Sequence, residues 1–133
     1  MDEQKITIKS HWDRLPMNYI DTGDVEEGSD LSLNYFKKID KIFKRKAFFA
    51  QEGDEKLFSG IINYSDLVGK KVLVVGCGMG SITQQLVLCG ALVTAIDLSE
   101  TSILATRKRL NYLGHNAPPL VDGVQARRGD YGL

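Results

Sequence analysis

The stretch Val72-Leu73-Val74-Val75-Gly76-Cys77-Gly78-Met79-Gly80 decides the fold. Its first four residues are apolar and mostly β-branched, which is typical of a strand buried on both faces of a parallel sheet. Three glycines at alternate positions follow, and Ser81 to Gln84 resembles a capping box that opens a helix. The stretch therefore predicts a strand that turns sharply into a helix, leaving backbone N–H groups free to bind an anion.

The residues after this turn repeat the same alternation. Gly90 is placed to end the helix, and residues 92–96 predict a second strand that ends at Asp97. Ser99 is placed to cap a further helix that runs to Leu113, and residues 124–128 predict a third strand. We therefore expect an α/β fold, a Rossmann-like doubly wound parallel sheet. We expect it to be truncated after the third strand, because such a sheet needs several more strands than the chain provides.

The first 68 residues differ in character from the rest. Residues 21–30 are acidic and rich in turn-forming residues, which predicts a loop. Leu33, Phe36, Ile39 and Phe43 recur at helical spacing, with lysines and arginines on the remaining surface. We expect residues 1–68 to form a loop and helical extension, and residues 69–133 to form a partial cofactor-binding domain.

Composition narrows the function classes. The 133-residue chain has a formal net charge of zero, so nothing favours nucleic acid or a membrane surface as a partner. It has no apolar run near the roughly 20 residues that span a bilayer. Cys77 and Cys89 form no CxxC pair or metal-ligand cluster, so we expect no metal and a reducing, cytoplasmic environment.

The glycine turn and Asp97 together predict a ligand pocket. A carboxylate at the tip of the neighbouring strand accepts hydrogen bonds from both hydroxyls of a ribose, while the turn receives a negative tail. A dinucleotide fingerprint would place its third glycine at position 81, but Ser81 stands there and the third glycine is Gly80. The spacing thus disfavours the alternative of an NAD(P)-binding oxidoreductase.

These motifs resemble those of class I S-adenosylmethionine-dependent methyltransferases. The resemblance rests on residues 76–80, on residues 90–99 and on Gly129-Asp130, and it extends to His11-Trp12-Asp13 and Tyr35-Phe36. It implies a methyltransferase acting on a small molecule, with S-adenosyl-L-methionine as cofactor.

The resemblance also implies roles for particular residues. Its cofactor-binding residues are Gly76, Cys77, Gly78, Gly80, Asp97, Leu98 and Asp130. Gly76 and Gly78 would line the methionine portion, and Asp97 would bind the ribose. Leu98 would pack on the adenine, and Asp130 would bind its amino group. In this family the acceptor-side residues usually follow a fourth strand, so no catalytic residue is assigned.

Other features point away from a complete, active enzyme. The family usually has Asp or Glu where Val74 stands, and that acid helps to hold the methionyl amine. A non-catalytic remnant is therefore a further alternative, and we expect the chain alone to be inactive. We also expect self-association through the exposed edge of the first strand.

The roles of some further residues stay open. Trp12 and Tyr35 could cap the cofactor or pack in the core, and Arg107, Lys108 and Arg109 suit the end of a helix without a further role.

Overall fold

A computed structural model of the chain describes residues 3–14, 31–47, 56–113 and 125–128. Its helices and strands follow one another in the order α1 (Glu3–Arg14), α2 (Leu33–Lys46), the 3₁₀ helix η2 (Tyr64–Leu67), β1 (Lys71–Val75), α3 (Ser81–Leu88), β2 (Leu92–Asp97), α4 (Glu100–Leu113) and β3 (Gln125–Arg128).

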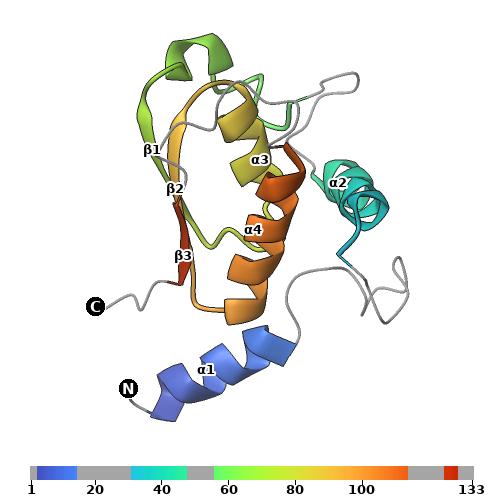
Figure 1. Cartoon of the computed structure of the whole chain (residues 1–133), viewed down its shortest axis with the longest axis vertical. Helices are drawn as coiled ribbons and strands as arrows, with labels where there is room; N and C mark the ends of the chain where they lie inside the picture. Colours follow the sequence, from blue (N-terminus) through green and yellow to red (C-terminus); the bar gives the residue numbers. More distant parts are fainter. Residues whose placement is uncertain (1–2, 15–30, 48–55, 114–124, 129–133) are drawn as a thin grey trace.

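The strands form one parallel sheet in the order β1-β2-β3 (Figure 1). Val75 at the end of β1 lies opposite Ile96 of β2, and Asp97 lies opposite Arg128 of β3. The carboxyl ends of β1 and β2 therefore meet at one edge of the sheet, where the glycine turn begins. The architecture is α/β with a parallel sheet, and it is compatible with a Rossmann-like fold.

Helices α3 and α4 cover one face of the sheet, and α2 packs outside them (Figure 1). Right-handed crossovers that step in one direction along a sheet place both connecting helices on the same side. The prediction that β1 is buried on both faces is consequently wrong. Val72 and Val74 are partly buried beneath the helices, whereas Leu73 and Val75 are 59% and 64% exposed on the opposite face.

Helix α2 forms where the apolar periodicity predicted it. The Ser32 hydroxyl accepts a hydrogen bond from the Tyr35 N–H and caps the first turn. Phe36 and Ile39 are buried as expected, but Leu33 is exposed. Tyr35 is also buried, in a cluster with Phe36, Ile39 and Met79, which agrees with its alternative role in the core. Helix α1, in contrast, was not predicted.

The predicted helix ends are partly right. Gly90 has the left-handed conformation expected after α3 (φ +88°), and the Ser99 hydroxyl accepts a hydrogen bond from the Ser102 N–H at the start of α4. The capping box at Ser81 does not form. Gly80 occupies the N-cap position without a side-chain hydrogen bond, and the Ser81 hydroxyl binds Asp40 of α2 instead.

Candidate cofactor-binding site

The turn between β1 and α3 is held against the end of β2. The N–H groups of Gly76 and Cys77 both donate to the Ile96 carbonyl, at 2.8 and 3.1 Å. The Gly80 N–H closes the turn on the Cys77 carbonyl at 2.9 Å. Backbone hydrogen bonds thus fix the turn directly beside Asp97.

The Asp97 carboxylate faces the turn, as the sequence predicted. One oxygen accepts the Gly78 N–H at 2.9 Å, and the other accepts the Ser99 N–H at 2.8 Å. A carboxylate has about four lone-pair sites, so each oxygen can accept a further hydrogen bond from a ligand hydroxyl. Leu98 follows with intermediate exposure, whereas Asp130 lies outside the described residues.

A cavity of about 260 Å³ opens beside the turn. Gly76, Gly78 and Met79 line one side, and Ile39 and Phe43 of α2 line another. Sites for whole small molecules are typically about 300–1,000 Å³, so this cavity suits only a part of a nucleoside cofactor. The contribution of α2 was not predicted, because it depends on how that helix packs.

Helix α4 supports the turn through a residue that sequence reasoning missed. Thr106 is fully buried, and its hydroxyl donates to the Gly78 carbonyl at 3.1 Å and contacts the Cys77 sulfur at 3.4 Å. Its position three residues after Ile103, on the buried face of the helix, is the signal that could have indicated this role.

Arg109 was expected only to suit the end of its helix, but it has a further role. It is 1% exposed, and it donates to the Asp40 carboxylate at 2.7 Å and to the Phe36 carbonyl at 3.2 Å. The same Asp40 oxygen accepts the Ser81 hydroxyl at 2.6 Å. Asp40 therefore joins α2, α3 and α4 just behind the glycine turn.

Gly80 should be the turn glycine most sensitive to substitution for stability. A Cβ at Gly80 would lie 2.9 Å from the Thr106 hydroxyl, whereas a Cβ at Gly78 would meet nothing within 4 Å. Both residues have positive φ, so Gly78→Ala controls for backbone strain. We expect Gly80→Ala to lower the free energy of unfolding by about 1–2 kcal/mol more than Gly78→Ala, measured by urea denaturation. Equal losses would contradict the packing shown here.

The Cys77 thiol should react slowly with alkylating reagents in the folded protein. Burial raises the pKa of its thiol to about 11, and the nearby Asp97 charge acts in the same direction, against the hydrogen bond with Thr106. The thiol thus stays protonated until the pH approaches that value, and only about one molecule in a thousand carries the reactive thiolate at pH 8. In the Cys89→Ser variant, where Cys77 is the remaining cysteine, we expect iodoacetamide labelling to be slow when folded and fast in urea. Rapid labelling of the folded protein would refute this.

Within the described ranges there is no group of three or more His, Cys, Asp or Glu side chains placed to hold a metal ion. None of the helices described is both long and apolar enough to cross a bilayer.

The fold and site define an α/β protein in which a glycine-rich turn and a strand-end carboxylate meet at the carboxyl edge of a parallel sheet. No family model matches the chain. The similarity to class I S-adenosylmethionine-dependent methyltransferases is nevertheless confirmed by several curated relatives that are named ubiquinone biosynthesis O-methyltransferase.

The relative from Nitrosococcus oceani is 45% identical over 47 residues, which are 35% of this chain and 20% of that protein. The relative from Azotobacter vinelandii is 51% identical over 41 residues, 31% of this chain and 18% of that protein. The relative from Chromobacterium violaceum is 33% identical over 87 residues, 65% of this chain and 35% of that protein. The matches thus span about a third or less of each relative.

Proposed function

We propose that the chain is the cofactor-binding portion of an S-adenosylmethionine-dependent methyltransferase that acts on a small-molecule acceptor in the cytoplasm. The observation that carries this proposal is the hydrogen bond between the Asp97 carboxylate and the Gly78 N–H, which joins the glycine turn to the end of β2. The names of the relatives support methyl transfer as the reaction class. Residues 69–133 would form the cofactor-binding unit and residues 1–68 the extension that packs on it.

The residues of the turn fit such a cofactor. A Cβ at Gly76 or Gly78 would point into open space, so the two glycines leave room for a ligand to approach the backbone. In the proposal they line the methionine portion together with Cys77 and Gly80. The start of α3 favours the carboxylate of that portion.

Asp97 would hold the ribose hydroxyls, Leu98 would contact the adenine, and Asp130 would bind the adenine amino group. When bound, S-adenosylmethionine supplies a methyl group on a sulfonium, whose leaving group is already activated. The residues of this chain would contribute to the reaction by fixing that methyl group in position for an acceptor, because alignment accounts for much of the catalysis of such displacements.

Two alternatives to this proposal differ in their support. A dinucleotide cofactor would need a glycine at position 81, where the Ser81 hydroxyl binds Asp40, so the structure gives this alternative no support. A remnant that binds no cofactor is supported by Val74, which packs against buried apolar residues and offers no charge to a methionyl amine. We therefore expect the chain to bind its cofactor weakly.

Calorimetric titration separates these functions. We expect S-adenosylmethionine and its product S-adenosylhomocysteine to bind the chain, and NAD and NADP not to bind at the same concentrations. Preferential binding of NAD or NADP would establish the oxidoreductase alternative, and binding of none of them would establish the remnant.

The isolated 133-residue chain should self-associate and should not transfer a methyl group. Leu73 and Val75 expose apolar surface on the open face of the sheet, and in the part of the chain that the structure describes β1 pairs with β2 alone. We expect the sedimentation coefficient to rise with protein concentration, and Leu73→Lys to reduce that rise. A monomer at every concentration would contradict the prediction, as would methyl transfer by the chain alone.

A further inference from the structure

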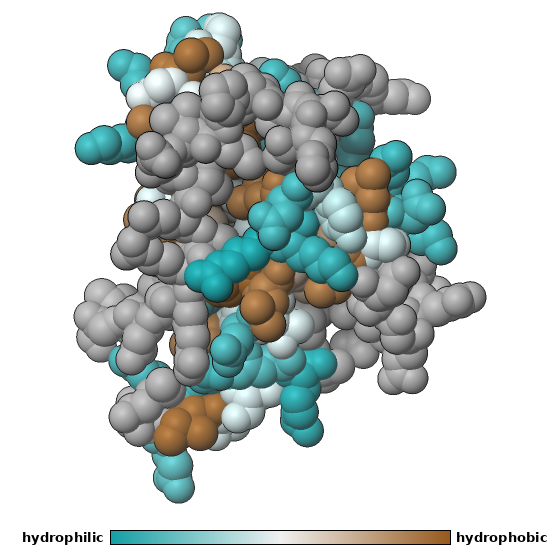
Figure 2. Space-filling view, in the orientation of Figure 1, coloured by the Kyte–Doolittle hydropathy of each residue, from teal (hydrophilic) through white to brown (hydrophobic). Residues whose placement is uncertain are grey.

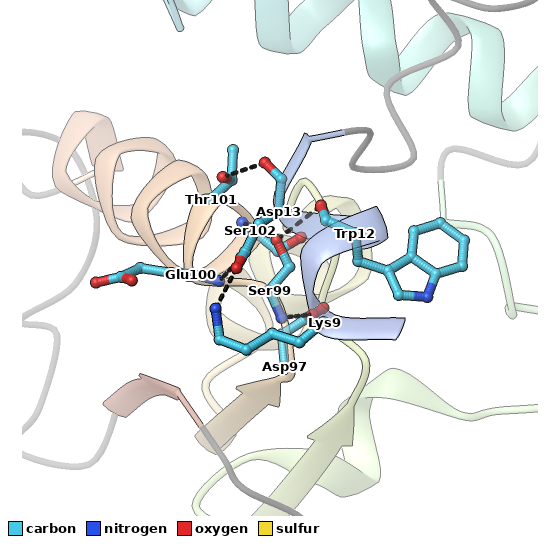
Figure 3. A network of polar contacts seen from close by, with 8 residues as sticks. All are labelled: Lys9, Trp12, Asp13, Asp97, Ser99, Glu100, Thr101 and Ser102. Carbon is cyan, nitrogen blue, oxygen red and sulfur yellow. Dashed lines mark hydrogen bonds and ion pairs between the residues drawn. The ribbon is translucent and has the colours of Figure 1, made fainter. Parts of the chain in front are cut away.

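We propose that α1 positions the ribose-binding segment, and that Asp13 acts as a positioning residue for Asp97. This inference rests on the proposed function, because it assigns α1 to the same cofactor site. It follows from contacts at the end of α1: Asp13 binds the amide of Glu100, and the neighbouring Ser99 links the Trp12 carbonyl to Asp97 (Figure 3). Asp97 in turn binds the Gly78 amide of the glycine turn.

The end of α1 contacts the three residues that open α4. The Asp13 carboxylate accepts the Glu100 N–H at 2.7 Å, and the Asp13 carbonyl accepts the Thr101 hydroxyl at 2.8 Å. The Trp12 carbonyl accepts the Ser99 hydroxyl at 3.0 Å. Each partner lies 87 or 88 residues further along the chain, so these contacts join two segments that are far apart in the sequence.

Asp13 supplies a second cap to α4, beside the one that Ser99 provides. The first N–H groups of a helix have no partner inside it, and a carboxylate there is stabilised by the helix dipole. Ser99 caps the Ser102 N–H at 3.2 Å, while Asp13 takes the Glu100 N–H. Burial alone would raise the pKa of Asp13, but its hydrogen bonds with Lys9 and Glu100 lower it below the usual value. The carboxylate therefore stays ionised at neutral pH.

Ser99 then connects α1 to the proposed site. The Ser99 N–H donates to one Asp97 oxygen at 2.8 Å, and the other Asp97 oxygen accepts the Gly78 N–H at 2.9 Å. Ser99 is thus held by α1 through its hydroxyl and holds Asp97 through its amide. A shift of Ser99 would turn the carboxylate away from the direction needed for ribose.

Polar contacts, rather than apolar burial, fix α1 in place. The helix has no buried residue, and Ile6 and Ile8 are about half exposed. Hydrophobic side chains reach the surface over α1 at the lower end of Figure 2. The Trp12 indole points away from the hydrogen-bonded cluster in Figure 3, so this residue contributes its carbonyl and not its ring.

Coupling of this kind is reciprocal. If docking of α1 orders Asp97 for the ribose, then a bound ligand that uses Asp97 must also strengthen the docking of α1. A helix that merely stabilised the whole domain would affect all ligands of the site equally.

The first arm of the test needs no ligand. We compare the parent with Asp13→Ala, with the conservative Asp13→Asn, and with Ile8→Ala as a matched control on the exposed surface of α1. Hydrogen exchange of the Ser99 and Gly78 amides should be about two- to tenfold faster in Asp13→Ala, the effect of one hydrogen bond. Asp13→Asn should restore part of the protection, and Ile8→Ala should match the parent. Unchanged exchange in Asp13→Ala overturns the inference.

The second arm uses S-adenosylhomocysteine and an analogue that lacks the ribose 2′-hydroxyl. We expect Asp13→Ala to weaken binding of S-adenosylhomocysteine about two- to tenfold. Binding of the analogue should weaken less, because the analogue makes fewer contacts with Asp97. Equal weakening of both ligands assigns α1 a purely structural role and overturns the inference. If the parent binds neither ligand, the proposed function fails, while the exchange arm still decides whether Asp13 orders the Asp97 segment.

Discussion

Asp40→Ala is expected to lower the free energy of unfolding by about 3–4 kcal/mol. The substitution leaves the Arg109 guanidinium, which is 1% exposed, without its carboxylate partner at 2.7 Å. Removing one member of a buried ion pair typically costs about 3–5 kcal/mol, because the other charge stays buried and uncompensated. We place the effect in the lower part of that range, since the Asp40 side chain is 39% exposed and the pair is partly screened by water.

Replacing Arg109, the other member of the ion pair, should lower the free energy of unfolding by less. Arg109→Met removes the buried charge and fills most of its volume, and the remaining Asp40 carboxylate can be hydrated because it is partly exposed. Burial already lowers the pKa of Arg109 against the opposing effect of Asp40, which indicates that its charge is held at a cost. The double variant should therefore be close to Arg109→Met alone.

Urea denaturation followed by circular dichroism, at low protein concentration, measures these differences. The order of stability expected is parent, then Arg109→Met, then Asp40→Ala. A loss in Asp40→Ala no greater than that in Arg109→Met would contradict the assignment of a buried cation that depends on Asp40.

Much of the site could be predicted because its signals are local. The alternating glycines, the Asp97 that ends the next strand and the Ser99 that caps α4 lie in short, contiguous patterns. Each pattern fixes a turn or a helix end through neighbouring residues, and the parallel sheet then brings the carboxyl ends of β1 and β2 together.

The rest depended on packing between distant segments. Arg107, Lys108 and Arg109 read alike in sequence, and only the placement of α2, with Asp40 some 69 residues earlier, makes Arg109 a buried residue. The capping pattern at Ser81 failed for the same reason, because Asp40 takes its hydroxyl.

Helix α1 was missed because its signals are weak. Its apolar residues do not form a buried face, and the hydrogen bonds that hold the helix join residues far apart in sequence. Periodicity detects helices that bury one face, so a helix attached by hydrogen bonds at one end gives little pattern to detect.

Asp97→Ala should weaken binding of S-adenosylhomocysteine by roughly tenfold to a hundredfold, or about 1.5–3 kcal/mol, because two ribose hydroxyls lose a charged acceptor. The fold should survive. The Gly78 N–H also loses its acceptor, but Gly78 has intermediate exposure, so water can take the place of the carboxylate there. The Ser99 N–H loses its acceptor in a buried residue, so we expect a loss of stability of about 1–3 kcal/mol.

Two further variants sharpen the measurement. Asp97→Asn keeps one acceptor oxygen and should lose less affinity than Asp97→Ala, whereas Asp66→Ala removes an exposed acid in η2 and should bind like the parent. Calorimetric titration gives the affinities, and circular dichroism checks that each variant is folded. Parental affinity in a folded Asp97→Ala variant would exclude Asp97 as the ribose acceptor. The glycine turn would then have to bind the ligand without the carboxylate at 2.9 Å from its central N–H, which would move the site away from the end of β2.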